Sequence, residues 1–383
     1  MKKILLIHNQ YIEKGGEDIA VQNEIDFLKS NKNYQIEEFI VSNSDKNIFS
    51  LLFIFLFNRN YFLDFKIRNK MKNFKPDVIY IHNTWFYISL GIFKIIKKEQ
   101  LNTVLKVHNF RYFCSSFLLA RNHFKDKKFC EACGMYKKDF KFLNKLYSDS
   151  LLKSILLLRY GNSYIKKIKD VKLLVLNEFH KNFMIENLQF EKDKIFVVPN
   201  KINFDYPKKN KKQNKIIYAG RISKEKGVEG LIKAFLTSSL NNIDLKIIGD
   251  GPELTNLTNK YGNNSKITFL GHKTNQFVLS EIQSARAVVT NTLMHEGQPT
   301  ILCEASLLST ISIFPRNGGI IDYFPSSYKF SFDNNLKNSL ITTLNLLQNK
   351  DIISSTEKNV KSYIDNLLNE NILLNQFEIA IYA

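Results

Sequence analysis

The sequence predicts an α/β protein built from two Rossmann-like domains that face a cleft. Short, unbroken apolar runs alternate with helix-like segments, as in parallel sheets whose strands are buried on both faces. The alternation starts twice, and a polar, basic stretch without periodicity separates the two series at residues 201–215. A chain of 383 residues also exceeds what one core usually holds.

The first series predicts a domain over residues 1–200. It opens with an apolar strand at residues 2–9, and the turn that follows contains Gly15 and Gly16. Apolar residues then recur at near-helical spacing from Asp18 onward. Further buried strands are expected at residues 35–41, 78–82, 103–108 and 173–176.

The second series predicts a domain over residues 201–360. Its expected strands are residues 215–220, 244–251, 266–271 and 287–291, with helices at 228–235, after Pro252 and around Glu304. The apolar residues of the tail, 361–383, predict a C-terminal helix that packs back on the first domain.

The formal charge of +19 calls for an anionic partner, such as nucleic acid, membrane headgroups or a phosphorylated substrate. Basic residues dispersed over solvated faces are the alternative. Nucleic acid is disfavoured because aromatic residues do not interleave with the cations. The apolar run at residues 48–57 is too short to span a bilayer and is either a buried helix or a face that dips into a membrane surface.

The expected location is the cytoplasm, with peripheral contact to the inner face of the membrane as a second possibility. Four cysteines do not make a disulfide framework, so a reducing compartment is expected. Neither a signal peptide nor a spanning segment is expected.

Ligands of α/β sheets bind where the strands end. Arg221 follows a strand, Lys226 comes five residues later, and Gly227 opens a helix. Two cations beside a helix N-terminus suit an anion, although two solvated surface cations would look the same. A nicotinamide dehydrogenase and a P-loop NTPase are both disfavoured, because the chain has neither G-x-G-x-x-G nor a Walker A pattern.

Two acids, Glu296 and Glu304, lie eight positions apart in EGQPTILCEA, one on a loop and one in the helix that Pro299 starts. A glycosidase-like pair would flank one bond from opposite sides. Two acids on one loop–helix unit approach a ligand from one side, which suits hydroxyl recognition better. Surface charge is the third reading.

At this point the chain resembles the retaining family 4 glycosyltransferases, which have the two-domain GT-B fold. The resemblance rests on the E-x7-E spacing of these two acids and on an ordered series of segments that covers nearly the whole chain. These segments are GGEDIAVQNEIDFL, KPDVIYIHNTW, LKVHN, VVPNKINFD, GRISKEKGVEGLIKAF, IIGDGPEL and NGGIID.

The resemblance implies a site for a nucleotide-sugar donor, with UDP or GDP as the nucleotide. Arg221 and Lys226 would grip the diphosphate, Glu296 would lie near the sugar and Glu304 would hold the ribose, with Gly297 and Thr300 beside them. Gly15 and Gly16 would approach the diphosphate or the acceptor. His108, which ends LKVHN, matches a position beside the transferred sugar. The catalytic set is therefore His108, Arg221, Lys226 and Glu296.

The resemblance also implies that sugar transfer needs no metal or other cofactor. Asp322, where many members have Glu, and Gln298-Pro299, which replace the commoner Phe-Gly, depart from the family pattern. Separately, Cys114, Cys130 and Cys133 include a C-x2-C pair, which is typical of zinc. A fourth ligand is not evident, since Cys303 belongs to a distant helix. His108 or His123 could complete a site, and free thiols are the other reading.

The predicted function is retaining transfer of a sugar to a glycan or lipid-linked acceptor in capsule, lipopolysaccharide or other surface-polysaccharide synthesis. The alternatives are a sugar phosphorylase or nucleotide-sugar epimerase of the same shape, and a non-catalytic membrane-associated scaffold. The presence of all four residues Arg221, Lys226, Glu296 and Glu304 argues against the scaffold.

Overall fold

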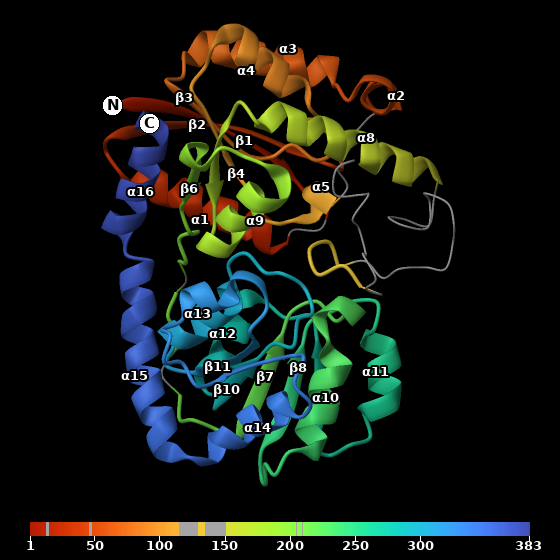
Figure 1. Ribbon diagram of the computed structural model, residues 1–383, viewed down its shortest axis with the longest axis vertical. Helices are drawn as coiled ribbons and strands as arrows, with labels where there is room; N and C mark the ends of the chain where they lie inside the picture. The colour runs from red at the N-terminus through yellow and green to blue at the C-terminus, as the bar shows by residue number, and fades with distance from the viewer. Residues whose placement is uncertain (13–14, 46–47, 115–128, 135–150, 204, 209) are drawn as a thin grey trace. The chain divides into compact units, whose positions relative to one another are not determined.

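The chain forms two compact units (Figure 1), as seen in a computed structural model that describes residues 1–12, 15–45, 48–114, 129–134, 151–203, 205–208 and 210–383. The first unit consists of Met1–Lys201 and Glu370–Ala383, and the second of Ile202–Asn369. Each unit has a parallel sheet of six strands and a core of its own. The predicted fold class of two Rossmann-like domains is confirmed at this level.

The sheet of the first unit has the strand order β2-β1-β3-β4-β5-β6. Its strands are β1 (Lys2–Gln10), β2 (Tyr34–Ser42), β3 (Val78–Asn83), β4 (Thr103–Lys106), β5 (Lys172–Val175) and β6 (Ile195–Val197). Its helices are α1 (Gly16–Ser30), α2 (Ile48–Phe57), α3 (Tyr61–Phe74), α4 (Gly91–Glu99), α5 (Arg111–Cys114), α8 (Leu151–Ile168), α9 (Glu178–Leu188) and α16 (Glu370–Tyr382), with the 3-10 turn η1 (Lys192–Lys194).

The first sheet is covered on both faces, which explains why its strands read as unbroken apolar runs. Ile4 and Leu6 of β1 point into a cluster with residues of α1 and α16. Leu5 and Ile7 point to the other face, where α3, α4, α8 and α9 pack. Successive side chains of a strand alternate in this way because the backbone is pleated.

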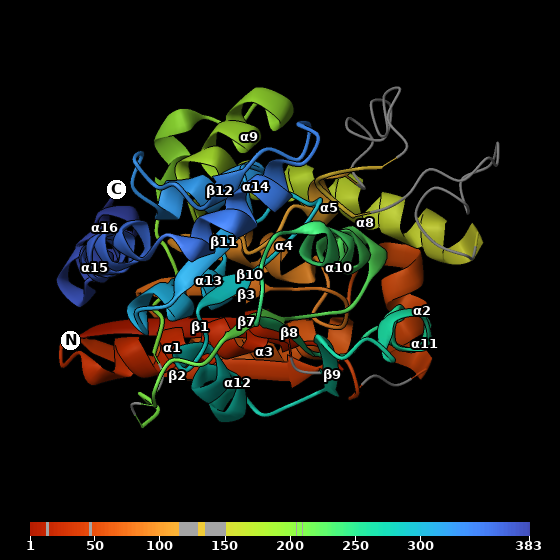
Figure 2. The same ribbon diagram turned by 90° about the horizontal axis from the view of Figure 1, so that it is seen from below.

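The sheet of the second unit has the order β12-β11-β10-β7-β8-β9, and β10, β7 and β8 lie side by side in Figure 2. Its strands are β7 (Lys215–Ala219), β8 (Asp244–Ile248), β9 (Ile267–Gly271), β10 (Ala287–Val289), β11 (Ile311–Pro315) and β12 (Ser331–Phe332). Its helices are α10 (Val228–Thr237), α11 (Leu254–Tyr261), α12 (Asn275–Gln283), α13 (Thr300–Leu307), α14 (Ser339–Asn345) and α15 (Lys350–Leu367), with the 3-10 turns η2 (Lys224–Lys226), η3 (Gly318–Tyr323) and η4 (Leu346–Gln348).

The segment that returns to the first unit begins at Glu370, whereas the sequence patterns predicted that it begins at residue 361. Residues 361–367 continue α15 and belong to the second unit, because Val360, Ile364 and Leu368 are buried in its core. Only α16 returns to the first unit. There the Tyr34 hydroxyl donates to Glu378 (2.7 Å) and the Asn102 amide donates to the carbonyl of Ile381 (2.7 Å).

In both units the strand order reverses beside the first strand. This reversal is the switch point, and ligands of α/β sheets bind there, at the carboxyl ends of two adjacent strands. In the first unit these strands are β1 and β3, and in the second unit they are β7 and β10. Within the described part of the chain, no helix is long and apolar enough to cross a membrane.

Candidate functional site

Two residues of the second unit meet at its switch point. Lys226 ends the turn η2 after β7, and Glu296 lies on the loop that follows β10. The Nζ of Lys226 is 2.5 Å from Oε1 of Glu296, and the two side chains are 28% and 25% exposed. The Thr292 hydroxyl donates to the same carboxylate oxygen (2.9 Å). The structure thus joins a cation and an acid that are 70 residues apart.

Gly227 allows the two loops to approach each other. It has φ +65°, and a Cβ there would lie 2.1 Å from the carbonyl oxygen of Asn291. The Asn291 amide donates to the carbonyl of Gly227 (2.8 Å). A glycine is needed for both the backbone angle and the space. Because Gly227 also precedes the first residue of α10, this packing holds Lys226 beside that helix N-terminus.

The NGGIID segment supports the loop that carries Glu296 from the other side. Gly318 has φ +60°, and a Cβ there would lie 2.8 Å from the Cα of His295. Oδ1 of Asn317 lies 3.1 Å from Nδ1 of His295, and the Asn317 amide donates to the carbonyl of Met294 (3.1 Å). The amide of Gly319 donates to the carbonyl of Glu296 (3.2 Å). The backbone around Glu296 is therefore constrained before any ligand binds.

The other expected donor residues lie on the same group of loops. Arg221 is exposed just after β7, and no ion pair involves it within the described residues. Gly297 is buried, and Thr300 is the exposed first residue of α13. Pro299 is the N-cap residue of α13, so this helix begins one residue after the position that its fixed φ suggested.

Glu304 is a buried acid in α13, where its residue is 8% exposed. Burial raises the pKa of its carboxyl group to about 7. In the part of the chain that the structure describes, no side-chain hydrogen bond or ion pair reaches this carboxylate. A buried acid without a partner is destabilising as an anion and would gain from hydroxyl donors on a ligand.

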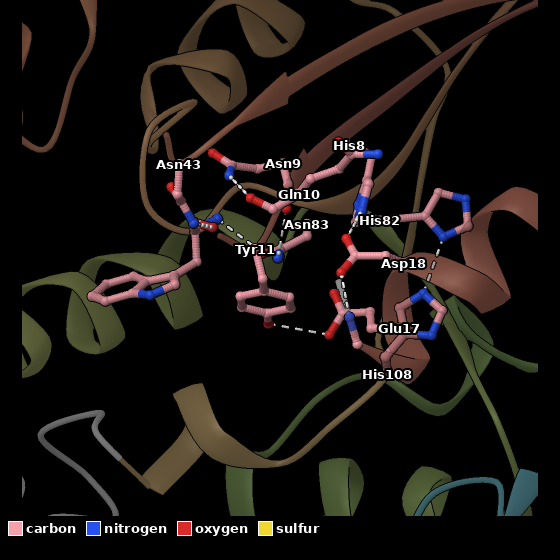
Figure 3. A network of polar contacts seen from close by, with 12 residues as sticks. His8, Asn9, Gln10, Tyr11, Glu17, Asp18, Asn43, His82, Asn83 and His108 are labelled. Atoms are coloured by element: carbon pink, nitrogen blue, oxygen red, sulfur yellow. Dashed lines mark hydrogen bonds and ion pairs between the residues drawn. The ribbon is translucent and has the colours of Figure 1, made fainter. Parts of the chain in front are cut away.

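A pair of histidines lies at the carboxyl ends of β3 and β4, next to the switch point between β1 and β3 (Figure 3). His82 is the penultimate residue of β3, and His108 lies two residues after the end of β4. Nδ1 of His82 is 3.0 Å from Nε2 of His108. Burial lowers the pKa of both rings well below the ordinary value, and the charge of nearby Lys106 lowers the pKa of His108 further. The two rings are therefore neutral at pH 7. The sequence analysis considered His108 by itself. In the structure, His82 of the neighbouring strand holds it in place.

A contact between His8 and Asp18 fixes the start of α1 in the same region. Nε2 of His8 lies 2.9 Å from Oδ1 of Asp18, and Oδ2 of Asp18 accepts from the amide of Gly15 (2.9 Å). Burial alone would raise the pKa of Asp18, but the bonds from His8 and Gly15 outweigh it and lower the pKa. At Gly15 and Gly16 a Cβ would meet nothing within 4 Å. Contacts inside the protein therefore do not require glycine at these two positions.

Glu17 lies beside His108 and was not singled out from the sequence. Its Oε2 accepts from the Tyr11 hydroxyl (3.2 Å) and the Asn109 amide (3.1 Å). Glu17, His82, His108 and Asn109 line one small depression of the first unit. His8, Asp18 and His82 were missed as well. His8 and His82 lie near the carboxyl ends of predicted strands, where α/β sheets place their ligands, so this rule could have found these two.

Comparison with known proteins places the second unit in a family. Residues 200–366 match the family model described as Glycosyl transferases group 1. The chain is 23% identical over 273 residues to a 41.2 kDa protein of the cps region of Klebsiella pneumoniae. The match covers 64% of this chain and 63% of that relative, less than two thirds of its length.

Solved structures are similar over both units at low sequence identity. HepE from Anabaena in complex with UDP-glucose has a TM-score of 0.70 at 12% identity, and the match covers all of both chains. Sucrose-phosphate synthase from Thermosynechococcus elongatus has a TM-score of 0.71 at 12% identity, over 99% of this chain and 98% of that one. WaaG, a glycosyltransferase involved in lipopolysaccharide biosynthesis, has 0.63 at 15%, over 94% and 95%. Residues 200–366 thus match the Glycosyl transferases group 1 family, and the chain shares the two-domain GT-B fold of these solved structures.

Proposed function

We propose that this protein transfers a sugar, with retention of the anomeric configuration, from a uridine-diphosphate sugar to a lipid-linked acceptor in surface-polysaccharide synthesis. The observation that carries the donor half is the Lys226–Glu296 ion pair at the switch point of the family-matched unit. UDP is the first choice of nucleotide because the HepE structure contains UDP-glucose.

The donor site follows from the charges around this pair. In this proposal Lys226 and Arg221 bind the donor diphosphate. The N-terminus of α10, which follows Lys226 after Gly227, adds peptide N–H groups that favour an anion. As the sugar–phosphate bond breaks, charge grows on the leaving phosphate, and preorganised cations stabilise that charge. Glu296 then exchanges its contact with Lys226 for the hydroxyl groups of the sugar, and Glu304 accepts from the ribose diol.

The acceptor half is assigned to the first unit. His108 is neutral and can donate or accept one hydrogen bond at a sugar hydroxyl. Glu17 offers a carboxylate beside it. Gly15 and Gly16 leave open space at the start of α1, so that a ligand can approach the backbone closely.

An exposed aromatic surface on α2 and α3 supports a membrane-bound acceptor. One face of α2 is exposed and wholly apolar, at the helical spacing i, i+3, i+4, i+7 and i+8: Phe49, Leu52, Phe53, Leu56 and Phe57. On α3, Phe62 is 54% and Phe65 is 64% exposed, and the ammonium of Lys66 lies 4.4 Å from the Phe62 ring centre. An apolar face with cations at its edge suits the surface of an anionic bilayer.

Product analysis tests the reaction. UDP should raise the apparent melting temperature more than GDP or ADP, because a ligand that binds only the folded state stabilises it. With a UDP-sugar and a lipid-linked acceptor, the expected products are UDP and a glycoside with the donor's anomeric configuration. Turnover of the donor without any acceptor would indicate an epimerase, and sugar transfer only to or from inorganic phosphate would indicate a phosphorylase. Either outcome would replace this proposal.

Vesicle co-sedimentation tests the membrane surface. The protein should sediment with anionic vesicles, and Phe49→Ser with Phe65→Ser should weaken binding by roughly tenfold for each phenylalanine that inserts. Phe277→Ser is the matched control, since Phe277 is 39% exposed on α12 of the second unit. Equal loss in the control, or no sedimentation of the wild type, would remove the membrane part and leave sugar transfer untouched.

A further inference from the structure

Three cysteine side chains from two separate segments converge in the first unit. Cys114 is the last residue of α5, whereas Cys130 and Cys133 lie in a short turn. The sulfurs of Cys114 and Cys130 are 3.6 Å apart, and all three sulfurs lie within 4.8 Å of one another. Each of the four cysteines of the chain is a thiol rather than half of a disulfide.

The spacing of the sulfurs matches a tetrahedral metal centre. With a zinc–sulfur distance of about 2.3 Å, two thiolates on one zinc ion lie about 3.8 Å apart. The Cys114–Cys130 separation of 3.6 Å is close to that value, and the 4.8 Å limit on the other two pairs is compatible with it. Three thiols can form at most one disulfide, which would leave the third sulfur without a role.

The turn that carries two of the sulfurs is closed by a backbone hydrogen bond and a glycine with positive φ. Gly134 donates its amide to the carbonyl of Cys130 (2.9 Å) and has φ +76°, which glycine adopts without strain. This reversal brings the two sulfurs of the C-x2-C pair to one side. Cys114 is buried at 4% exposure, while Cys130 and Cys133 are partly exposed, so solvent reaches one side of the cluster.

We propose that Cys114, Cys130 and Cys133 bind one zinc ion as thiolates, with the fourth position taken by water or one further ligand. Each thiol releases its proton to solvent as the zinc–sulfur bond forms, and no electron is transferred. His108 does not complete this site, because it bonds to His82 and is not part of the group of converging ligands. His123 lies outside the described residues.

The ion would act as a structural link. It would tie the turn at residues 130–134 to α5, which begins three residues after His108. The inference is independent of the proposed sugar-transfer chemistry, to which none of the three cysteines is assigned. It assigns the cysteines a role that neither the donor residues nor the acceptor residues supply.

Metal analysis of the full-length protein tests the site. Protein purified with a non-thiol reductant and without chelator should contain roughly one zinc per chain, since three thiolates and one further ligand complete one tetrahedral centre. Cobalt(II) substituted for zinc should show the charge-transfer bands of thiolate ligation. Cys114→Ser and Cys133→Ser should each lose the zinc and these bands, whereas Cys303→Ala, which removes a buried thiol of the second unit, should keep both.

A cysteine variant could lose zinc because it fails to fold, so the wild-type protein is tested as well. Stripping its zinc with a chelator should lower the melting temperature, and added zinc should restore it. Zinc far below one equivalent in reduced wild type, with all four thiols titratable in the unfolded chain, would overturn the proposal. A mass two hydrogens lower, which marks a disulfide between two of the four cysteines, would overturn it too.

Discussion

Lys226→Ala separates the stability of the second unit from its proposed chemistry. The Lys226–Glu296 pair has a short contact of 2.5 Å, but both side chains are about one-quarter exposed, at 28% and 25%. Partly solvated pairs of this kind contribute about 0.2–1 kcal/mol to folding. The substitution should therefore lower the melting temperature by only a few degrees, since 1 kcal/mol corresponds to about 2–4 °C for a domain of this size.

The effect on catalysis should be far larger. Lys226 is assigned to the charge that develops on the leaving diphosphate, and removal of one such preorganised donor typically lowers kcat about 10²–10³-fold. The rate of UDP release at a saturating donor concentration measures the effect on kcat. Circular dichroism and a thermal melt on the same samples measure the effect on folding. Lys224→Ala is the matched control, because it removes the same charge from an exposed position of the same turn.

Glu296→Gln should not weaken nucleotide binding. Without the carboxylate, Lys226 no longer has to exchange an ion pair for the phosphate, so affinity for UDP should hold or rise while sugar transfer falls.

Near wild-type kcat in Lys226→Ala would refute the diphosphate assignment. The same conclusion would follow if Lys224→Ala lost activity equally, since the effect would then be general electrostatics.

Two further outcomes are expected from the buried charges. The pKa of Glu304 is about 7 in the folded protein and 4.5 in the unfolded chain. Its contribution to folding stability is therefore complete below about pH 4.5 and falls by roughly 3 kcal/mol as the pH rises through 7. In Glu304→Gln the melting temperature should depend less on pH over this range. Lys106→Met should destabilise the first unit by about 3–5 kcal/mol, because the Glu24 carboxylate, 2.7 Å from Lys106 Nζ, stays buried without its cation.

Each of these has its own check. If Glu304 accepts from the ribose, UDP affinity in calorimetry should rise with pH through 7, because the ligand favours the carboxylate; an affinity that falls over this range would contradict the assignment. For the buried lysine, Lys97→Met is the comparison, since the Lys97–Asp170 pair is 78% and 63% exposed and its loss should leave the melting temperature unchanged. Adding Glu24→Gln to Lys106→Met should recover part of the lost stability.

The sequence by itself determined the fold class and the family resemblance. Alternation of buried strands and helices over two series needs only local periodicity, and the structure confirms two parallel sheets. The ordered motifs were sufficient for the family resemblance, which the match at residues 200–366 confirms. The roles of Arg221, Lys226, Glu296 and Glu304 stay predictions, because residue spacing identifies which side chains lie near strand ends but not what they bind.

Only the tertiary structure decided which of these side chains meet. The Lys226–Glu296 pair and the His82–His108 pair join the ends of strands that are adjacent in space, and strand order is not written in any local pattern. Hydrophobic periodicity also placed residues 361–367 in a helix without saying which core would bury it. The physical reason is the same in each case: periodicity reports which face of an element is buried, whereas partners depend on the packing of whole elements.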